Sequence, residues 1–205
     1  MKPQEFIQLM KKYGEEIAQI RQSAHDLHAE VNQTYDNVLP YGHHLDMVAD
    51  AVKEYGYAVC ECEEDVVPLF FGAYYHDSIE DARLTYNNVK AIAGQWMNTS
   101  QALMAAEMVY ALTNEKGRTR AERANDKYYQ GIRETPYAPF LKLSDRLANI
   151  SYSCSTSSES GRCSCMKDVY SSEWQHFIES IKSDQNDIRY NLPEEMISRI
   201  EEMIG

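Results

Sequence analysis

Apolar residues recur along almost the whole chain at spacings of three and four, and this helical period is the feature that most constrains the fold. Residues 6–31 show it first, with Phe6, Leu9 and Ile17 on one stripe. Gly14 interrupts the stripe, so we expect a break or bend there. No segment alternates apolar and polar residues at the period of two that a half-buried strand requires. The sequence therefore predicts an all-α fold, a helical bundle in a single domain.

Turn residues and capping residues divide the rest of the chain. Asn, Thr, Asp and Pro cluster at 32–40, which predicts a loop, and Asp65 is a good N-cap for the helix that follows it. Residues 151–165 hold seven serines with almost nothing to bury, so we expect a mobile surface loop there. The helical period predicts helices at about 45–56, 65–77, 85–95, 100–112, 118–132, 137–150, 166–182 and 193–204.

The length of 205 residues is that of one domain. We expect residues 1–182 to form it, with the Ser- and Cys-rich segment 151–165 as a flexible insertion and residues 183–205 as a helical extension packed on the same domain. No window approaches the ~18–20 apolar residues needed to cross a bilayer, and the first residues lack the pattern of a signal peptide. We therefore expect a cytoplasmic protein without a membrane partner. The sequence is silent on oligomeric state.

The formal net charge is −12, which argues against binding to duplex nucleic acid because such binding needs a basic surface. An anionic ligand must instead be held by a local basic patch or by a metal. The five cysteines form two C-x-C pairs and one single residue, which is not a secreted disulfide framework. We expect reduced thiols, and a metal or redox role for Cys154, Cys163 and Cys165 is the alternative.

Residues 76–81, HDSIED, place an imidazole and three carboxylates within about one helical turn. A divalent cation would neutralise these charges, and the alternative is a solvated acidic helix end. Further imidazoles occur in PYGHH, residues 40–44. Asp145 is a lone acid in an apolar run, so it needs a metal or a cation such as Lys142 or Arg146.

With these motifs the chain resembles the HD-domain metal-dependent phosphohydrolases, and among them the hydrolase domain of RelA/SpoT-type enzymes and the small stand-alone alarmone hydrolases. The resemblance spans about residues 24–180. The segments that carry it are PYGHHLDMVA (40–49), YYHDSIED (74–81), LTNEKGRTRAER (112–123), LKLSDRLANI (141–150) and, more loosely, VYSSEWQHF (169–177). It departs from the family before the Pro-Tyr pair, where relatives usually carry basic residues and this chain has TYDNVL (34–39).

The resemblance implies an HD-type bundle that holds one divalent ion, with Mn²⁺ favoured. His43 competes with His44 for the first ligand position, and counting from the Pro-Tyr pair favours His44. Glu80 and Asp81 fall on the catalytic pair of the family, and the sequence does not divide their roles. The implied metal ligands are His44, His76, Asp77 and Asp145.

The substrate implied by the resemblance is a guanosine 3′,5′-bisdiphosphate-type alarmone that loses its 3′-pyrophosphate. Residues 116–133 carry six basic against two acidic side chains, which suits a ligand with several phosphates. The alternatives are an HD-domain nucleotidase or phosphodiesterase that acts on another nucleotide, and a nucleotide sensor that does not hydrolyse its ligand. The candidate substrate-binding residues are Lys116, Arg118, Arg120, Lys142, Asn149 and Tyr170.

Overall fold

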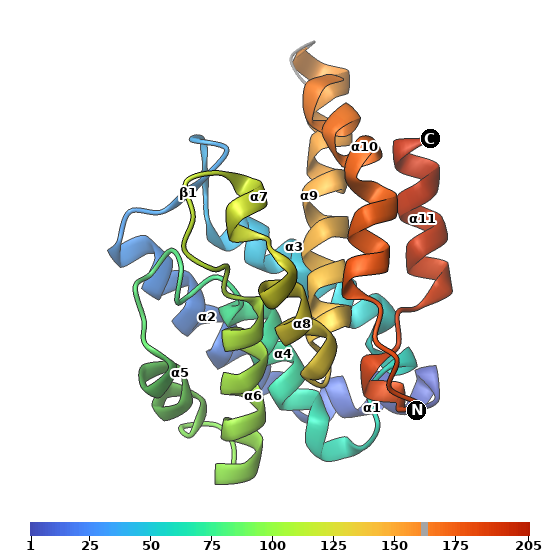
Figure 1. The fold of residues 1–205 in the computed structure, drawn as a ribbon. Helices are drawn as coiled ribbons and strands as arrows, with labels where there is room; N and C mark the ends of the chain where they lie inside the picture. Colours follow the sequence, from blue (N-terminus) through green and yellow to red (C-terminus); the bar gives the residue numbers. More distant parts are fainter. Residues whose placement is uncertain (161–163) are drawn as a thin grey trace.

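Helices make up most of the computed structural model, which describes residues 1–160 and 164–205, without the side chains of residues 120, 121, 156–160 and 164–166 (Figure 1). The only strands in these ranges are a pair of two residues each, so the all-α prediction is confirmed. The elements are α1 (Pro3–Lys12), α2 (Gly14–Glu30), β1 (Thr34–Tyr35), β2 (Leu39–Pro40), α3 (Gly42–Tyr55), α4 (Val66–Tyr75), α5 (Tyr86–Ala93), α6 (Thr99–Leu112), α7 (Arg120–Arg123), α8 (Asp126–Glu134), α9 (Ala138–Ser160), α10 (Ser164–Ile181) and α11 (Glu194–Ile204).

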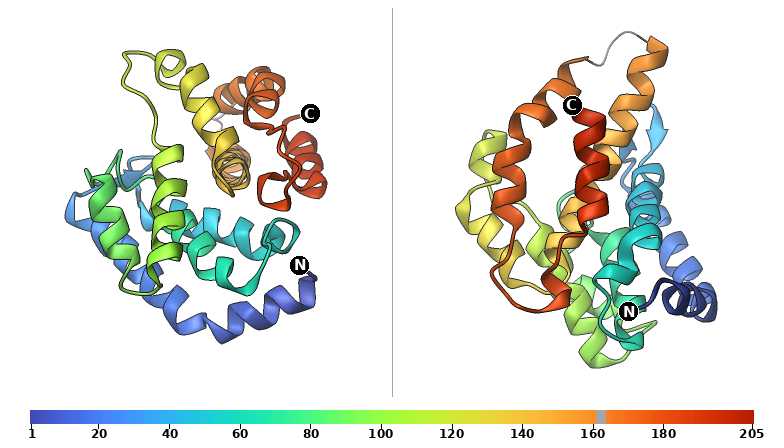
Figure 2. Two further views of the ribbon diagram at one scale, coloured as in Figure 1. Left: turned by 60° about the horizontal axis from the view of Figure 1, so that its bottom comes forward. Right: turned by 90° about the vertical axis from the view of Figure 1, so that its right-hand side faces the viewer.

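The predicted interruption of the first helix is confirmed. The helix α1 ends at Lys12 and α2 begins at Gly14, so the two helices share one apolar stripe but differ in direction (Figure 2). Phe6 and Ile20 from this stripe are almost fully buried. The stripe therefore packs the N-terminal helices onto the core formed by the rest of the chain.

The core is built around α4, whose residues are all buried. This helix packs against α2, α3 and α6. It also contacts α9, and a Cβ added at Gly72 would lie 2.6 Å from Cδ1 of Leu141 on that helix. A larger residue at position 72 would therefore force the Leu141 side chain to move. One metal-ligand candidate follows α4 and another lies on α9, so the contact between these helices brings the two candidates near each other.

The predicted role of Asp65 as an N-cap is wrong. Asp65 directly precedes α4, but its side chain makes no capping hydrogen bond. Its carboxylate instead accepts a hydrogen bond from the Tyr137 hydroxyl at 2.5 Å. Both side chains are buried, so this long-range bond satisfies two polar groups that water cannot reach.

The predicted helix at 118–132 is two helices, α7 and α8. Asn125 separates them, because its backbone is extended and its side-chain oxygen accepts a hydrogen bond from the backbone N–H of Tyr128 at 3.1 Å. Asparagine is among the best N-cap residues. The spacing of apolar residues gives no signal for this N-cap, so it could not predict that a second helix begins here.

The prediction of a loop from Ser151 is wrong as far as Ser160, because α9 continues to that residue. Serine hydroxyls in the helix find partners within it, as when Ser153 Oγ donates to the carbonyl of Asn149 at 2.9 Å. The ring centroids of Tyr152 and Tyr35 are also 4.7 Å apart, so this part of α9 packs against a residue distant in sequence. Residues 161–163 of the predicted loop lie outside the described residues.

The C-terminal residues pack on the same bundle. Met196, Ile200 and Ile204 of α11 are buried, and the helix contacts α9 and α10 (Figure 2). Within the described ranges, no helix combines the length and the apolar character that a membrane span needs.

Candidate metal centre

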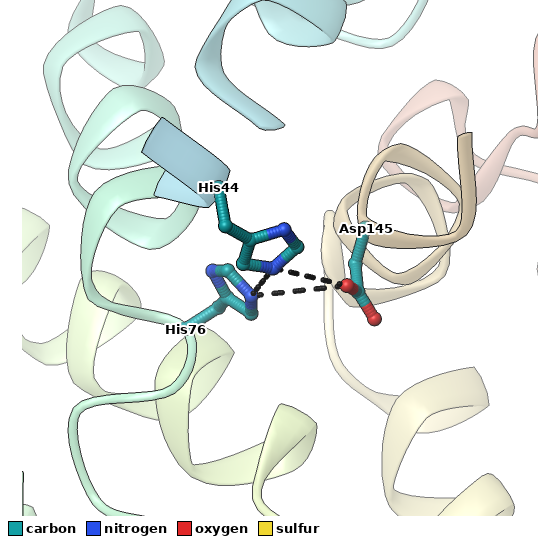
Figure 3. A group of neighbouring side chains, drawn as sticks. All are labelled: His44, His76 and Asp145. Carbon is teal, nitrogen blue, oxygen red and sulfur yellow. Dashed lines mark hydrogen bonds and ion pairs between the residues drawn. The ribbon is translucent and has the colours of Figure 1, made fainter. Parts of the chain in front are cut away.

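Three side chains from separate segments meet at one point, and each offers a potential metal ligand (Figure 3). His44 lies in the first turn of α3, His76 directly follows α4, and Asp145 lies on α9. The two Nε2 atoms are 3.2 Å apart. Oδ1 of Asp145 is 3.3 Å from Nε2 of His44 and 4.0 Å from Nε2 of His76.

These separations suit one shared cation. Ligand atoms that each lie about 2.1 Å from an ion are roughly 3.0–3.4 Å apart at angles of 90–109° and about 4.2 Å apart when they are opposite. The three separations in this cluster lie within that range. Imidazole nitrogen and carboxylate oxygen are ligands that Mn²⁺, Fe²⁺ and Zn²⁺ accept.

Asp77 lies at the same point. Its Oδ2 is 2.9 Å from Nε2 of His76 and 3.7 Å from Nε2 of His44. The same oxygen accepts a hydrogen bond from the Tyr41 hydroxyl. The structure therefore brings His44, His76 and Asp145 together and places Asp77 beside both histidines, and these are the four side chains that the resemblance implies as metal ligands. His43, the competing candidate, is exposed and lies near the Tyr35 ring rather than in this cluster.

The hydrogen bonds around His76 prepare its ring to bind a cation. Its Nδ1 donates to the carbonyl of Ala73 at 2.9 Å, so the neutral ring carries its free lone pair on Nε2. That atom faces Nε2 of His44, and both imidazoles are at most 3% exposed. Two buried ring nitrogens that face each other need a proton or a cation between them. The donor set therefore fits a divalent ion.

The electrostatics of the cluster show how the protein balances these charges by itself. Burial favours the neutral carboxyl of Asp145, but the Lys142 ammonium at 2.9 Å together with His44 and His76 outweighs it, and the pKa of Asp145 lies well below its usual range. Burial also lowers the pKa of His76, but the Asp77 carboxylate outweighs this effect and the pKa rises to about 9. Two carboxylates are thus held ionised in a buried site.

The sequence predicts that the helix continues to residue 77. In the structure, residues 76–81 instead form consecutive turns after α4. Glu80 projects from these turns and accepts hydrogen bonds from the backbone N–H of Asn114 at 2.5 Å and from its side-chain amide at 3.2 Å. Although Glu80 keeps contact with solvent, desolvation and then the charge of Asp77 raise its pKa. The same two causes raise the pKa of Asp81. Both carboxylates therefore border the cluster without belonging to it.

A cavity of about 770 Å³ opens beside the cluster, and Asp145 belongs to both. Three predicted substrate-binding residues, Lys142, Asn149 and Tyr170, line it. The structure adds Arg123, which belongs to the predicted basic stretch, and side chains that the sequence did not single out for this role. These further lining residues include Asn114, Arg123, Arg146, Glu173, His176 and Phe177.

The other predicted substrate-binding residues lie elsewhere. Lys116 and Arg118 are exposed on the segment between α6 and α7 and are not part of the described cavity lining. The side chain of Arg120 lies outside the described residues. Of the remaining cations in the basic stretch, Lys127 pairs with Glu115 at 2.7 Å and Arg133 donates to a backbone carbonyl at 2.6 Å. Among the described side chains of the basic stretch, only the Arg123 cation lines the cavity, so the stretch is not one phosphate-binding patch in this structure.

The cysteines offer no second centre among the described residues. Cys60 is buried, Cys62 is exposed, and Cys154 is half-buried with its Sγ 3.7 Å from the carbonyl oxygen of Met203. Cys163 and the side chain of Cys165 lie outside the described residues. The metal or redox role considered for Cys154, Cys163 and Cys165 thus gains no support here.

The buried ring of His28, near the end of α2, is expected to make the fold less stable at acidic pH. Its ring is 1% exposed and stacks on Tyr41, and neither ring nitrogen has a hydrogen-bond partner among the described residues. Burial lowers its pKa to about 4, whereas the unfolded chain binds this proton with a pKa near 6.5. Between these values the unfolded state holds more protons, so stability falls as pH falls.

We expect wild type to lose about 3 kcal/mol of unfolding free energy from this residue between pH 6.5 and pH 4. His28→Phe keeps a ring against Tyr41 but cannot bind the proton. Urea unfolding at a series of pH values should therefore give a flatter curve for the variant. Parallel curves for the two proteins would show that His28 is not responsible.

No protein-family model matches the chain, and no curated protein matches its sequence.

Proposed function

We propose that the protein is a metal-dependent phosphohydrolase that acts on a phosphorylated nucleotide, most favourably by removing the 3′-pyrophosphate of guanosine 3′,5′-bisdiphosphate. One observation carries this proposal. A cluster of two imidazoles and two carboxylates from three separate segments shares Asp145 with a cavity whose lining also includes basic side chains. Such a set suits an ion and a phosphate side by side.

His44, His76, Asp77 and Asp145 would hold the ion. A divalent ion bound there would lower the pKa of a water molecule and offset the negative charge of phosphate oxygens. Glu80 or Asp81 would accept the proton of the attacking water, since both border the cluster and both have raised pKa values. The water oxygen would form a bond to phosphorus as the O3′–phosphorus bond breaks, and O3′ would take up the proton released by the water and leave as the ribose hydroxyl.

The cavity supports a ligand with several phosphates. Arg123 and Lys142 are cations in its described lining, and Asn149 adds a polar group next to Asp145. Arg146 is held differently, because its guanidinium lies 4.1 Å from the centre of the Phe177 ring. It therefore stabilises the wall of the cavity.

The direct test is a product assay. The purified protein is incubated with Mn²⁺ and guanosine 3′,5′-bisdiphosphate, and we expect equal amounts of pyrophosphate and GDP. A panel of other nucleotides, with phosphate and pyrophosphate measured separately, distinguishes the proposal from a different nucleotidase or phosphodiesterase. Tight binding of unchanged nucleotide with no product would identify a sensor instead.

Glu80→Gln tests the proton acceptor. A general base contributes typically about 10²–10⁴-fold to a rate, so we expect a loss of that size in kcat. The pKa of Glu80 is raised, and a base works only when ionised. The wild-type rate should therefore fall as pH falls through this raised value, and the variant should lose that part of the profile. An unchanged kcat would assign the role away from Glu80.

A further inference from the structure

A short hairpin lies next to the metal-ligand cluster. It joins α2 to α3, and its strands pair Thr34 with Pro40 and Tyr35 with Leu39. The two residues at its tip, Asp36 and Asn37, have φ values of 52° and 60°. Aspartate and asparagine tolerate this left-handed region better than most residues, and two such residues in succession make the tight turn that suits a hairpin. The turn fixes where Tyr35 lies.

Tyr35 contacts one proposed metal ligand directly. Its ring stacks on the ring of His44, with centroids 5.0 Å apart and an interplanar angle of 16°. It also donates a hydrogen bond from its hydroxyl to Oδ1 of Asn149 at 2.9 Å. Burial raises the pKa of Tyr35, so the hydroxyl stays protonated and remains a donor.

Asn149 links Tyr35 to a second proposed metal ligand, Asp145. Its Nδ2 donates to Oδ1 of Asp145 at 2.6 Å and to the backbone carbonyl of Asp145 at 3.0 Å. A carboxylate and a carbonyl only accept hydrogen bonds, so the amide must face Asp145 with its nitrogen and Tyr35 with its oxygen. The carboxylate oxygen that Asn149 holds is the one 3.3 Å from Nε2 of His44.

We propose that Tyr35 is a positioning residue of the metal centre, which orients Asp145 through Asn149 and His44 through ring stacking. This inference rests on the metal centre of the proposed function but not on its substrate. It also gives Asn149 a task besides the predicted contact with a nucleotide. Partners of this kind fix the orientation of metal ligands and raise metal affinity.

The test is Mn²⁺ binding to the apo full-length protein, measured by isothermal titration calorimetry. Loss of a hydrogen-bond partner of a metal ligand typically weakens binding about 10- to 100-fold. We expect that loss for Asn149→Ala, and about tenfold, the lower end of the same range, for Tyr35→Phe, which keeps the stacked ring. Because the hydroxyl acts through Asn149, the double variant should bind Mn²⁺ as Asn149→Ala does.

Tyr152→Phe is the matched control. The Tyr152 hydroxyl also joins α9 to the hairpin, by donating to Oδ2 of Asp36 at 3.1 Å, but Asp36 is not a metal ligand. We expect its Mn²⁺ affinity to equal that of wild type. The apo melting temperature of every variant is measured as well, since a merely structural role of Tyr35 would lower that temperature without changing metal affinity.

Each other outcome overturns the inference in a recognisable way. Wild-type affinity in Tyr35→Phe removes the positioning role, and equal losses in Tyr35→Phe and Tyr152→Phe reduce it to attachment of the hairpin. Additive losses in the double variant exclude the path through Asn149. Failure of wild type to bind Mn²⁺ refutes the metal centre itself. Binding of Mn²⁺ without hydrolysis of any nucleotide refutes the proposed function alone.

Discussion

Asp77→Ala is expected to abolish the release of pyrophosphate from guanosine 3′,5′-bisdiphosphate in the presence of Mn²⁺. Two properties tie Asp77 to the cluster. Its Oδ2 lies within 3.7 Å of both histidine Nε2 atoms, and its charge is what raises the pKa of His76 most. Removal of this carboxylate takes away one proposed ligand and leaves the Tyr41 hydroxyl without its acceptor.

The measurement separates binding from turnover. Mn²⁺ affinity is determined by calorimetry, and product formation is followed at saturating Mn²⁺. We expect turnover to fall by at least about 100-fold, because the ion supplies the electrostatic stabilisation of the transition state. Asp50→Ala is the control, since Asp50 is an exposed carboxylate on α3 that pairs with Lys53 at 2.7 Å. Full activity in Asp77→Ala would remove the proposed site.

Lys142→Met is expected to be the most destabilising single change at the site, at about 3–5 kcal/mol of unfolding free energy in the absence of metal. Lys142 and Asp145 form an ion pair of 2.9 Å, and their side chains are only 18% and 15% exposed. Removal of the ammonium leaves a buried carboxylate without its main partner. The pKa of Asp145 should then rise, because Lys142 is the group that lowers it most.

Lys127→Met provides a matched comparison. Lys127 and Glu115 form a pair of 2.7 Å, but the lysine is 77% exposed. Solvent screens such a pair, so we expect a much smaller loss than for Lys142→Met. Urea unfolding of both variants at pH 7 without metal gives the two values. Similar losses in the two variants would show that burial does not govern the Lys142–Asp145 pair.

The helices were predictable where one face is buried over many residues. Periodicity located α3 and α6, because their apolar positions face the core over several turns. It failed where a single side chain decides the local structure, as at Asn125, which begins a new helix. It also failed at Ser153, where the composition indicated a loop but a hydroxyl bonds to the preceding turn of the helix.

The candidate site was predictable to the extent that its residues occur in recognisable motifs. His76 and Asp77 are adjacent in the chain, and Asp145 is conspicuous as a lone acid among apolar residues. Tyr35 gives no comparable signal, because its contacts with His44 and Asn149 depend on a turn of two residues and on helices distant in sequence. The predicted phosphate-binding role of Lys116 and Arg118 followed from local charge density, which does not say on which side of the protein a cation lies.

The three proposed ligands lie in α3, directly after α4 and in α9. Binding of an ion there would therefore depend on the assembly of these three segments. His44 and Asp145 are separated by all the residues from α4 to α8, so the unfolded chain would have to close a long loop to bring them together. An ion held between them would act as a reversible cross-link between α3 and α9. Separation of α3 from α9 and release of the ion would then be a single event, and the occupied site would slow the opening of the whole molecule.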